Sequence, residues 1–263
     1  MKASLWLGQL TWVRVTRIAW QTLAEQFGLG VRWLGGLVQL VGFASDYRRF
    51  RLLNREGHFN LRVKDVYPCL QDRTGSTPVE PIYVLQDSWF ARKISEQKPS
   101  THVDVGSSAR AMTLVAQFVP VTFVDIRPVE IQLPGFTFLA GSILGLPFAD
   151  KSLGSISSLC VIEHIGLGRY GDPFDALGSE KAASELCRVL APAGNLYVSL
   201  PIDQECRIYF NAHRAFSREY VLHLFPDLML IEEQYIYGRS TFSAYEPQRG
   251  FGTGLFPFRR PCE

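Results

Sequence analysis

The sequence lacks the marks of a disulfide-bonded or zinc-binding domain. No C-x-x-C pair occurs, and the five cysteines are Cys69, Cys160, Cys187, Cys206 and Cys262. An odd number at wide spacings provides neither a disulfide framework nor a metal site. We therefore expect reduced, buried cysteines, as is usual in a cytosolic protein.

Long apolar runs are also absent. No uninterrupted apolar stretch reaches the roughly 18 residues that a transmembrane helix needs. The apolar stretch after Lys2 is interrupted by Arg14 and Arg17, and no small-residue cleavage site follows it. We therefore expect no signal peptide and a cytoplasmic location, with membrane association as a further possibility.

Two glycine-rich phosphate-binding loops are missing as well. The chain has no G-x-x-x-x-G-K-[ST] sequence, so a P-loop is excluded. A dinucleotide site uses G-x-G-x-x-G, whereas residues 106–111 read Gly-Ser-Ser-Ala-Arg-Ala and keep only the first glycine. This counts against NAD or FAD as the cofactor.

What is present fits a globular protein with an uneven charge distribution. Of 263 residues, 47% are hydrophobic and 20% are charged, which is near the globular average. Residues 1–64 hold ten Lys or Arg and three Asp or Glu, whereas the remainder holds seventeen and twenty-two. An acidic body argues against nucleic acid as the main partner, because phosphate binding needs clustered cations.

Residues 1–60 are predicted to form a helical, basic, amphipathic extension. Residues 11–27 place their apolar positions largely on one side at helical spacing. A second apolar stretch, residues 31–44, is predicted to end at Ser45, before the basic cluster Arg48, Arg49 and Arg51. Such a Trp-bearing extension either lies on a membrane surface or packs on its own domain or on a twin subunit in an oligomer.

The rest of the chain is predicted to be a connector, residues 61–99, followed by a domain, residues 100–263. In the connector, residues 86–97 have helical spacing and end before Pro99. In the domain, strands are predicted at 102–105, 121–124, 136–140, 156–162 and 196–200, and helices at 109–118, 180–190 and 217–225. Residues 228–237 and 251–258 are long enough to pair as a terminal antiparallel hairpin.

Repeated strand–helix units of this kind predict an α/β fold with a doubly wound, mainly parallel sheet. In such a sheet, ligands bind beyond the carboxyl ends of the strands. The first strand leads through Gly106 into a helix capped by Ser107 or Ser108, and the second ends at Asp125, 19 residues after Gly106. An acid at that offset accepts hydrogen bonds from ribose hydroxyls. Together, the glycine turn and Asp125 favour a site for an adenosine-type ligand. The alternative is that Gly106 forms an ordinary strand–helix turn and Asp125 is a solvated loop residue.

Five segments stand in order between residues 100 and 201: Asp104-Val105-Gly106, Val124-Asp125, residues 146–152, residues 161–165 and residues 185–194. Together they resemble a class I S-adenosylmethionine-dependent methyltransferase. Residues 86–89, 166–173, 210–214 and 251–256 are similar to blocks of one branch of that fold, domain-of-unknown-function family 268. The resemblance covers roughly residues 80–260. It implies a seven-stranded Rossmann-like sheet and S-adenosylmethionine as cofactor.

The resemblance also implies roles for single residues. Asp104, Gly106 and Ser107 would hold the methionine part of the cofactor, and Asp125 would bind its ribose. The residues that would flank the adenine or the sulfonium are Ile126, Ser142, Ile143, Cys160 and Val161. The chain departs from the family pattern at Ser108, where a second glycine is usual. A Cβ at that position is expected to narrow the cofactor site.

The candidate chemistry follows the fourth strand. His164 is the first candidate for a general base toward a hydroxyl acceptor and Glu163 the second, with a structural histidine as the alternative. Substrate binding is predicted for Arg169, Asp172, Asn211, His213 and Arg214, because arginines grip a carboxylate or phosphate; a network that pins the loops is the alternative.

The sequence thus favours a methyltransferase acting on a small-molecule or sugar-like acceptor, with surface glycan synthesis suggested by family association. The alternative is a catalytically inactive methyltransferase-fold protein that acts as a binding or scaffolding module at a membrane surface.

Overall fold

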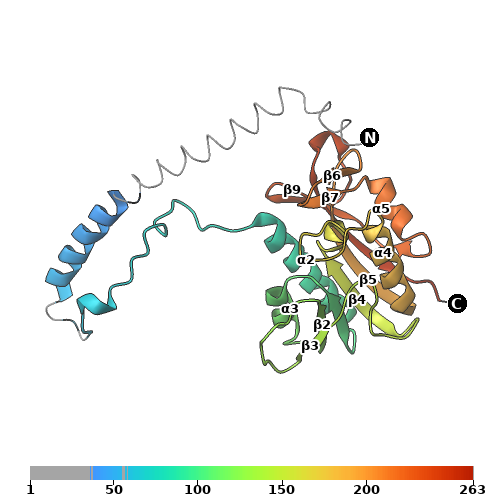
Figure 1. The fold of residues 1–263 in the computed structure, drawn as a ribbon, viewed down its shortest axis with the longest axis horizontal. Helices are drawn as coiled ribbons and strands as arrows, with labels where there is room; N and C mark the ends of the chain where they lie inside the picture. Colours follow the sequence, from blue (N-terminus) through green and yellow to red (C-terminus); the bar gives the residue numbers. More distant parts are fainter. Residues whose placement is uncertain (1–35, 37, 55–56, 58, 263) are drawn as a thin grey trace, which may run out of the picture. The chain divides into compact units, whose positions relative to one another are not determined.

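The structure, a computed structural model, describes residues 36, 38–54, 57 and 59–262 (Figure 1). The chain divides into two units between Pro78 and Val79. The helix predicted over residues 11–27 lies outside the described residues. Each unit is described by itself.

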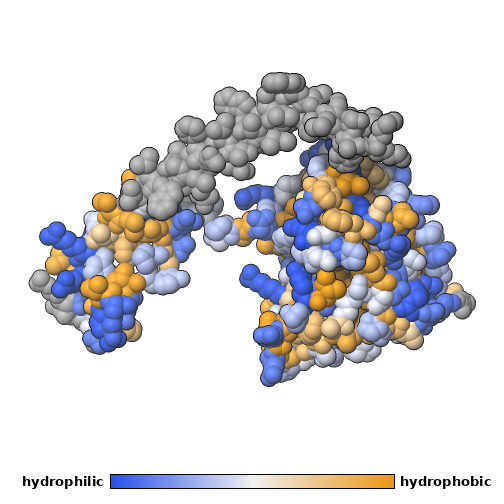
Figure 2. Space-filling view, in the orientation of Figure 1, coloured by the Kyte–Doolittle hydropathy of each residue, from blue (hydrophilic) through white to orange (hydrophobic). Residues whose placement is uncertain are grey.

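The first unit is built on a helix that covers residues 38–53, followed by the short η2 turn (Val63–Asp65). The predicted helix end at Ser45 is wrong, because the arginines that follow favour helix and extend it. Apolar side chains are exposed along it, with Val38 73% and Leu53 73% exposed, and Figure 2 shows apolar residues on the surface of this unit. None of the described helices is long and apolar enough to span a membrane.

The second unit is built on a sheet. Within the described residues its strand order is β10-β9-β11-β5-β4-β1-β2-β3, and β8 pairs with β11. The strands are β1 (His102–Val105), β2 (Val121–Asp125), β3 (Phe136–Ala140), β4 (Leu153–Leu159), β5 (Leu190–Ile202), β8 (Met229–Leu230), β9 (Gln234–Tyr237), β10 (Ser240–Phe242) and β11 (Gly252–Arg259). A separate two-stranded ribbon joins β6 (Arg207–Tyr209) to β7 (His213–Ala215).

The predicted seven-stranded, mainly parallel sheet is confirmed, with two short strands added. Strands β3, β2, β1, β4 and β5 pair in parallel. Strand β11 is antiparallel to both β5 and β9, so the predicted terminal antiparallel pairing is also confirmed. The additions are β8 and β10, of two and three residues, which pair with β11 and β9.

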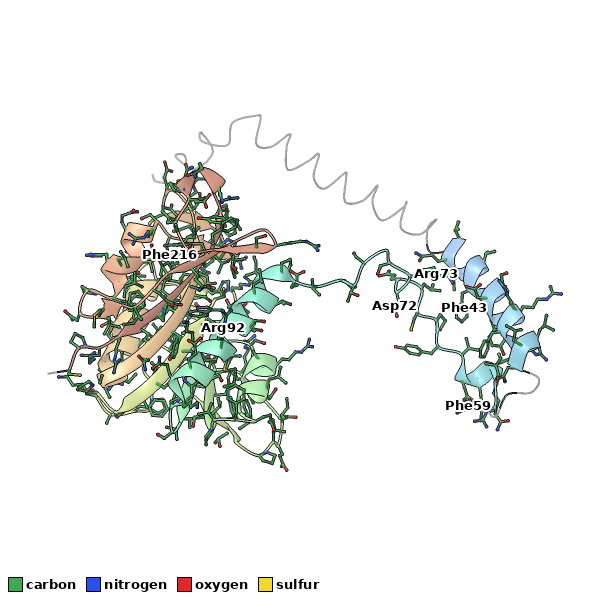
Figure 3. The ribbon with its side chains drawn as sticks, turned by 180° about the vertical axis from the view of Figure 1, so that it is seen from behind. Phe43, Phe59, Asp72, Arg73, Arg92 and Phe216 are labelled. Carbon is green, nitrogen blue, oxygen red and sulfur yellow. The ribbon has the colours of Figure 1, made fainter. Side chains whose placement is uncertain are left out.

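Helices cover both faces of the sheet, which makes it doubly wound (Figure 1). On one face, α2 (Pro81–Gln97) and α3 (Ala109–Val115) bury Phe90 and Met112 against Phe123 of β2. On the other, α4 (Gly178–Val189) and α5 (Arg218–Leu224) pack on the apolar residues of β5. Phe216, labelled in Figure 3, is buried in this second core. Because both faces are covered, all four residues of β1 are buried.

Several predicted boundaries are wrong by a few residues, and the backbone shows why. Helix α2 begins at Pro81 rather than Gln86, because proline suits the first helical turn. Helix α3 ends at Val115 rather than 118, where Phe118 N–H bonds to the Val115 carbonyl and the chain tightens. Strand β4 ends at Leu159 rather than 162, since Cys160 has a left-handed φ of 54°.

The cysteines are free, but the expectation that they are buried is wrong. Cys160 and Cys187 are half-buried, and the other three are exposed: Cys69, Cys206 and Cys262. Their exposure follows from their places in connecting segments rather than in the two cores.

Candidate active site

A pocket of about 370 Å³ opens where strands β1, β2, β3 and β4 end. Nine of the predicted site residues line it: Gly106, Asp125, Ile126, Ser142, Ile143, Cys160, Val161, His164 and Asp172. The carboxyl ends of neighbouring parallel strands bring them together, as the doubly wound topology requires. Seven predicted residues are not part of the lining: Asp104, Ser107, Glu163, Arg169, Asn211, His213 and Arg214.

In the turn after β1, the residue that lines the pocket is Gly106, which has no side chain. Gly106 has a φ of +74°, and a Cβ there would lie 3.0 Å from Cγ1 of Val161. Its N–H donates to the Val124 carbonyl at 2.8 Å. Glycine therefore suits a conformation that other residues rarely adopt, and a Cβ would be tight against Val161.

Asp104 and Ser107 hold this turn from behind. The Asp104 carboxylate accepts the Ser107 N–H at 3.1 Å and the Ser107 hydroxyl at 2.7 Å. Ser107 Oγ in turn accepts the Leu159 N–H at 2.8 Å. Complete burial raises the pKa of Asp104 to about 7. Their direct contact with a cofactor stays a prediction, and their visible role is to fix the loop.

A second buried group extends this network. The Ser157 hydroxyl donates to Asp104 and lies 2.9 Å from Nε2 of His102, whose Nδ1 lies 2.8 Å from Ser155 Oγ. Burial lowers the pKa of His102 to about 3, so its ring is neutral. The network therefore ties β1 to β4 below the pocket.

Ser108 lies two residues after Gly106, where the family pattern has a second glycine. It is the N-cap of α3, where its Oγ accepts the Ala111 N–H at 3.3 Å, and it is not part of the lining. The Ser108 hydroxyl turns into the helix that it caps, and the expected narrowing of the cofactor site by its Cβ stays a prediction.

Asp125 ends β2 with its carboxylate 8% exposed. One oxygen accepts the Arg127 N–H at 2.8 Å and Arg127 Nε at 3.2 Å, and the other lies 3.2 Å from Arg127 Nη2. The guanidinium carbon of Arg127 also lies 4.7 Å from the centre of the Tyr170 ring. Sequence reasoning missed both Arg127 and Tyr170, although Arg127 stands only two residues after the predicted ribose ligand.

Apolar side chains form the wall beside Asp125. Ile126 is 51% exposed, Ile143 is 5% exposed and Leu144 is 38% exposed, and all three line the pocket. Ser142 Oγ accepts the Leu144 N–H at 3.2 Å and so holds the turn that presents them. This wall offers a flat ring an apolar surface next to a carboxylate.

Cys160 lies at the opposite end of the lining, after β4. Its Sγ donates to Gln86 Oε1 at 3.0 Å, which also accepts the Ser199 hydroxyl at 2.5 Å. Burial raises the pKa of the Cys160 thiol, so it stays protonated. The buried Gln86 thus fastens α2 to the ends of β4 and β5.

Glu163 and His164 follow in the short η3 turn (Ile162–His164). Burial raises the pKa of Glu163 to about 8, and its Oε2 has no hydrogen-bond partner among the described residues. Burial also lowers the pKa of His164 to about 4, against the opposing effect of the Ala212 carbonyl 2.7 Å from its Nδ1. A carbonyl only accepts, so Nδ1 carries the proton and Nε2, 3.7 Å from Glu163 Oε1, is free to accept one.

Two of the predicted substrate residues pin the loops. Arg214 is 7% exposed and donates to the carbonyls of Ile165 at 2.6 Å and Asp175 at 3.1 Å. Asp172 accepts the Gly166 N–H at 2.6 Å and the Tyr170 N–H at 3.3 Å. The contacts of Arg214 and Asp172 are therefore those of the alternative, a network that pins the loops.

The other three lie around His164. Arg169 is exposed and donates to the Ala212 carbonyl at 2.8 Å, and its guanidinium carbon lies 5.1 Å from the Tyr170 ring centre. The ring centroids of His213 and His164 are 6.5 Å apart. Asn211 is exposed beside Ala212. The ribbon β6–β7 thus packs against the η3 turn that follows β4.

Comparison with known proteins relates part of the chain to one family. The model of the family described as Caenorhabditis protein of unknown function, DUF268, matches residues 148–233. No curated protein sequence matches the chain.

Among solved structures, the N-methyltransferase NodS from Bradyrhizobium japonicum WM9 in complex with S-adenosyl-L-homocysteine has a TM-score of 0.51 and 19% identity, over 69% of this chain and 88% of that chain. A putative sarcosine dimethylglycine methyltransferase from Galdieria sulphuraria has a TM-score of 0.50 and 16% identity, over 68% and 86%. The [4+2]-cyclase SpnF has a TM-score of 0.50 and 14% identity, over 67% and 81%. At these identities the likeness shows a shared fold.

Proposed function

We propose that this chain, which matches the DUF268 family model over residues 148–233 and has the fold of class I methyltransferases, is an S-adenosylmethionine-dependent methyltransferase acting on a small molecule. The observation that carries the proposal is Asp125. Its carboxylate lines a pocket between a bare glycine turn and an apolar wall, at the end of the second parallel strand. Those three surfaces are complementary to the parts of an adenosine ligand with an amino-acid arm.

The pocket residues fit this cofactor, which supplies, when bound, an electrophilic methyl group on a sulfonium. Gly106 leaves room for the amino-acid arm, on a turn that Asp104 and Ser107 support. Asp125 binds the ribose hydroxyls. The groups that flank the adenine are Ile126, Ser142 and Ile143, and those beside the sulfonium are Cys160 and Val161.

His164 is the general base in this proposal. Its Nδ1–H is held by the Ala212 carbonyl, so Nε2 is oriented toward Glu163 and is available to accept a proton from the acceptor. Glu163, protonated at neutral pH, lies next to it as a second proton-carrying group. A positioned base accelerates such a transfer by about 10²–10⁴-fold.

A sugar-like acceptor suits the surface around the mouth. Tyr209 and Phe251 are 40% and 45% exposed. Their rings lie 5.1 Å and 5.6 Å from the His213 ring. Exposed aromatic faces provide large, rigid contact area for a ring-shaped ligand, and Asn211 adds a polar group beside them. Surface glycan synthesis is a setting that such an acceptor fits.

Calorimetric titration with S-adenosylhomocysteine tests the cofactor assignment. We expect micromolar binding, weakened by about tenfold or more in Asp125→Asn, because hydrogen bonds to a charged acceptor contribute about 1.5–3 kcal/mol each. Asp227→Asn, an exposed position after α5, is the matched control. No binding at millimolar ligand would contradict the proposal and favour the alternative, a catalytically inactive binding module.

We also propose that the basic extension attaches the protein to a membrane surface from the cytoplasmic side. The helix over residues 38–53 exposes Val41, which is 72% accessible, and Leu53 alongside the cluster Arg48, Arg49 and Arg51. Apolar and cationic side chains on one helix suit an anionic lipid interface. The protein should sediment with anionic vesicles at low salt, and its failure to do so would overturn this second proposal.

A further inference from the structure

Two guanidinium groups meet at one tyrosine ring at the pocket mouth. The guanidinium carbon of Arg127 lies 4.7 Å from the centre of the Tyr170 ring, and that of Arg169 lies 5.1 Å from it. Both arginines are exposed, and Tyr170 lines the pocket. They come from distant parts of the chain, the end of β2 and the loop after β4, so the fold itself brings the two cations together.

The two arginines differ in whether a carboxylate pairs with them. Arg127 forms an ion pair with Asp125 at 3.2 Å. Arg169 forms no ion pair with a carboxylate of the described residues, and its Nη1 donates to the Ala212 carbonyl. The only negative charge paired with this cationic mouth, within the part of the chain that is described, is therefore Asp125.

Asp125 cannot serve two partners fully at once. Both of its oxygens accept hydrogen bonds from the Arg127 side chain. If Asp125 binds the ribose hydroxyls, the Arg127 guanidinium loses these bonds and its counter-charge. The mouth then holds two exposed guanidinium groups that form no ion pair with a carboxylate of the described residues, and their N–H donors suit an oxyanion.

We propose that cofactor binding releases Arg127 from Asp125, and that Arg127 and Arg169 then form a binding site for an anionic group of the acceptor. The inference rests on the proposed function, since it needs the ribose at Asp125. It names the acceptor class as a carboxylate- or phosphate-bearing molecule, because guanidinium groups bind these oxyanions with paired hydrogen bonds. Arg169 Nη1 lies 3.4 Å from Nδ1 of His164, so the anion site adjoins the proposed base.

This arrangement couples the two ligands. An anion that stabilises released Arg127 favours the state in which Asp125 is free for the cofactor, and the effect is reciprocal by thermodynamic linkage. Inorganic phosphate and acetate are simple probes of the two oxyanion classes. Arg127→Ala should also raise the affinity for S-adenosylhomocysteine, because the ligand no longer has to displace the arginine from Asp125.

Calorimetric titration of the full chain with S-adenosylhomocysteine, in chloride, phosphate or acetate at constant ionic strength, tests the inference. One oxyanion should tighten binding about fivefold or more, and the more effective one identifies the acceptor group. Arg127→Ala should bind more tightly than wild type in chloride and lose the oxyanion effect. Arg169→Ala should lose the effect, and Arg239→Ala, in the exposed β9–β10 turn, should keep it.

The outcomes separate the two proposals. Binding that neither oxyanion tightens, or that phosphate and acetate weaken, overturns this inference and leaves the cofactor assignment intact. An oxyanion effect that survives in Arg127→Ala also overturns it. Absence of S-adenosylhomocysteine binding in every buffer overturns the proposed function and the inference with it.

Discussion

Glu163 and His164 are neighbours whose pKa values burial shifts in opposite directions. Burial raises the pKa of Glu163 to about 8, so its carboxyl is protonated at neutral pH. Burial lowers the pKa of His164 to about 4, so its imidazole is neutral there. At neutral pH the pair thus consists of an uncharged acid and an uncharged base 3.7 Å apart. Two groups whose pKa values are moved apart by their surroundings are a frequent arrangement at sites of proton transfer.

Comparing the pH dependence of stability in Glu163→Gln and in wild type should reveal the raised pKa of the buried Glu163 carboxyl. The carboxyl ionises near its ordinary pKa of 4.5 in the unfolded chain but near 8 in the folded one, so wild-type stability falls as pH rises through this range. Glutamine does not ionise. The free energy of unfolding of the variant should therefore rise relative to that of wild type between pH 5 and pH 8, by up to about 1.4 kcal/mol per pH unit, and the difference should level off above pH 8. A difference that stays flat with pH, as expected for the exposed control Glu205→Gln, would contradict the assignment.

The imidazole of His164 can be observed directly. Its ¹⁵N and ¹H resonances, assigned by their loss in His164→Gln, should show the neutral Nδ1–H tautomer from pH 8 down to about pH 5, because burial and nearby Arg169 disfavour the charged ring. A titration centred near the ordinary value of 6.5 would show that His164 is solvated and not held as described.

Single residues also show what the sequence can and cannot predict about the site. Gly106 and Asp125 are predictable because each belongs to a local strand–turn unit with a fixed offset. Arg127 and Tyr170 were missed because their importance comes from a contact between segments more than forty residues apart. The sequence predicts Arg214 as a substrate ligand, and only the fold shows that its donors bind the backbone carbonyls of Ile165 and Asp175.

At the scale of elements, strands and helices with both local propensity and buried periodicity were predicted well. Strands β1 and β3 have the predicted bounds, because each is a short apolar run between turn signals. The end of β4 was misplaced because residues 160–162 are as apolar as the strand before them. A left-handed Cys160, which redirects the chain toward the pocket, has no signal in an apolar pattern.

Helix α3 offers a test of how the missing second glycine is accommodated. Ser108→Ala removes the N-cap hydrogen bond to Ala111 and should destabilise the protein by about 1 kcal/mol, whereas Ser108→Gly should cost only a few tenths. Neither change should alter S-adenosylhomocysteine affinity, because Ser108 does not line the pocket. Tighter binding by Ser108→Gly in calorimetry would show instead that the serine side chain restricts the site. Ser217→Ala, the equivalent cap of α5, is the matched control.

At the scale of the whole molecule, the division between Pro78 and Val79 separates two kinds of surface. Residues 79–263 contain both hydrophobic cores and every residue of the pocket. The described residues before them expose apolar and basic side chains. The proposed chemistry and the proposed membrane attachment therefore belong to different parts of the chain.

A fragment of residues 79–263 should fold on its own. We expect a single cooperative thermal transition and the S-adenosylhomocysteine affinity of the full chain, because the fragment keeps the two cores and the pocket. It should no longer sediment with anionic vesicles. Loss of cofactor affinity in a folded fragment would show that the first 78 residues contribute to the site.

The central claim is that the pocket at the ends of β1, β2, β3 and β4 binds S-adenosylmethionine through Asp125. A crystal structure of the chain with S-adenosylhomocysteine tests it most directly. We predict the ribose hydroxyls on the Asp125 carboxylate, the adenine between Ile126 and Ile143, and the Arg127 guanidinium withdrawn from Asp125. Ligand bound elsewhere, or bound in the pocket with the Arg127–Asp125 pair intact and the ribose directed away from it, would contradict the account.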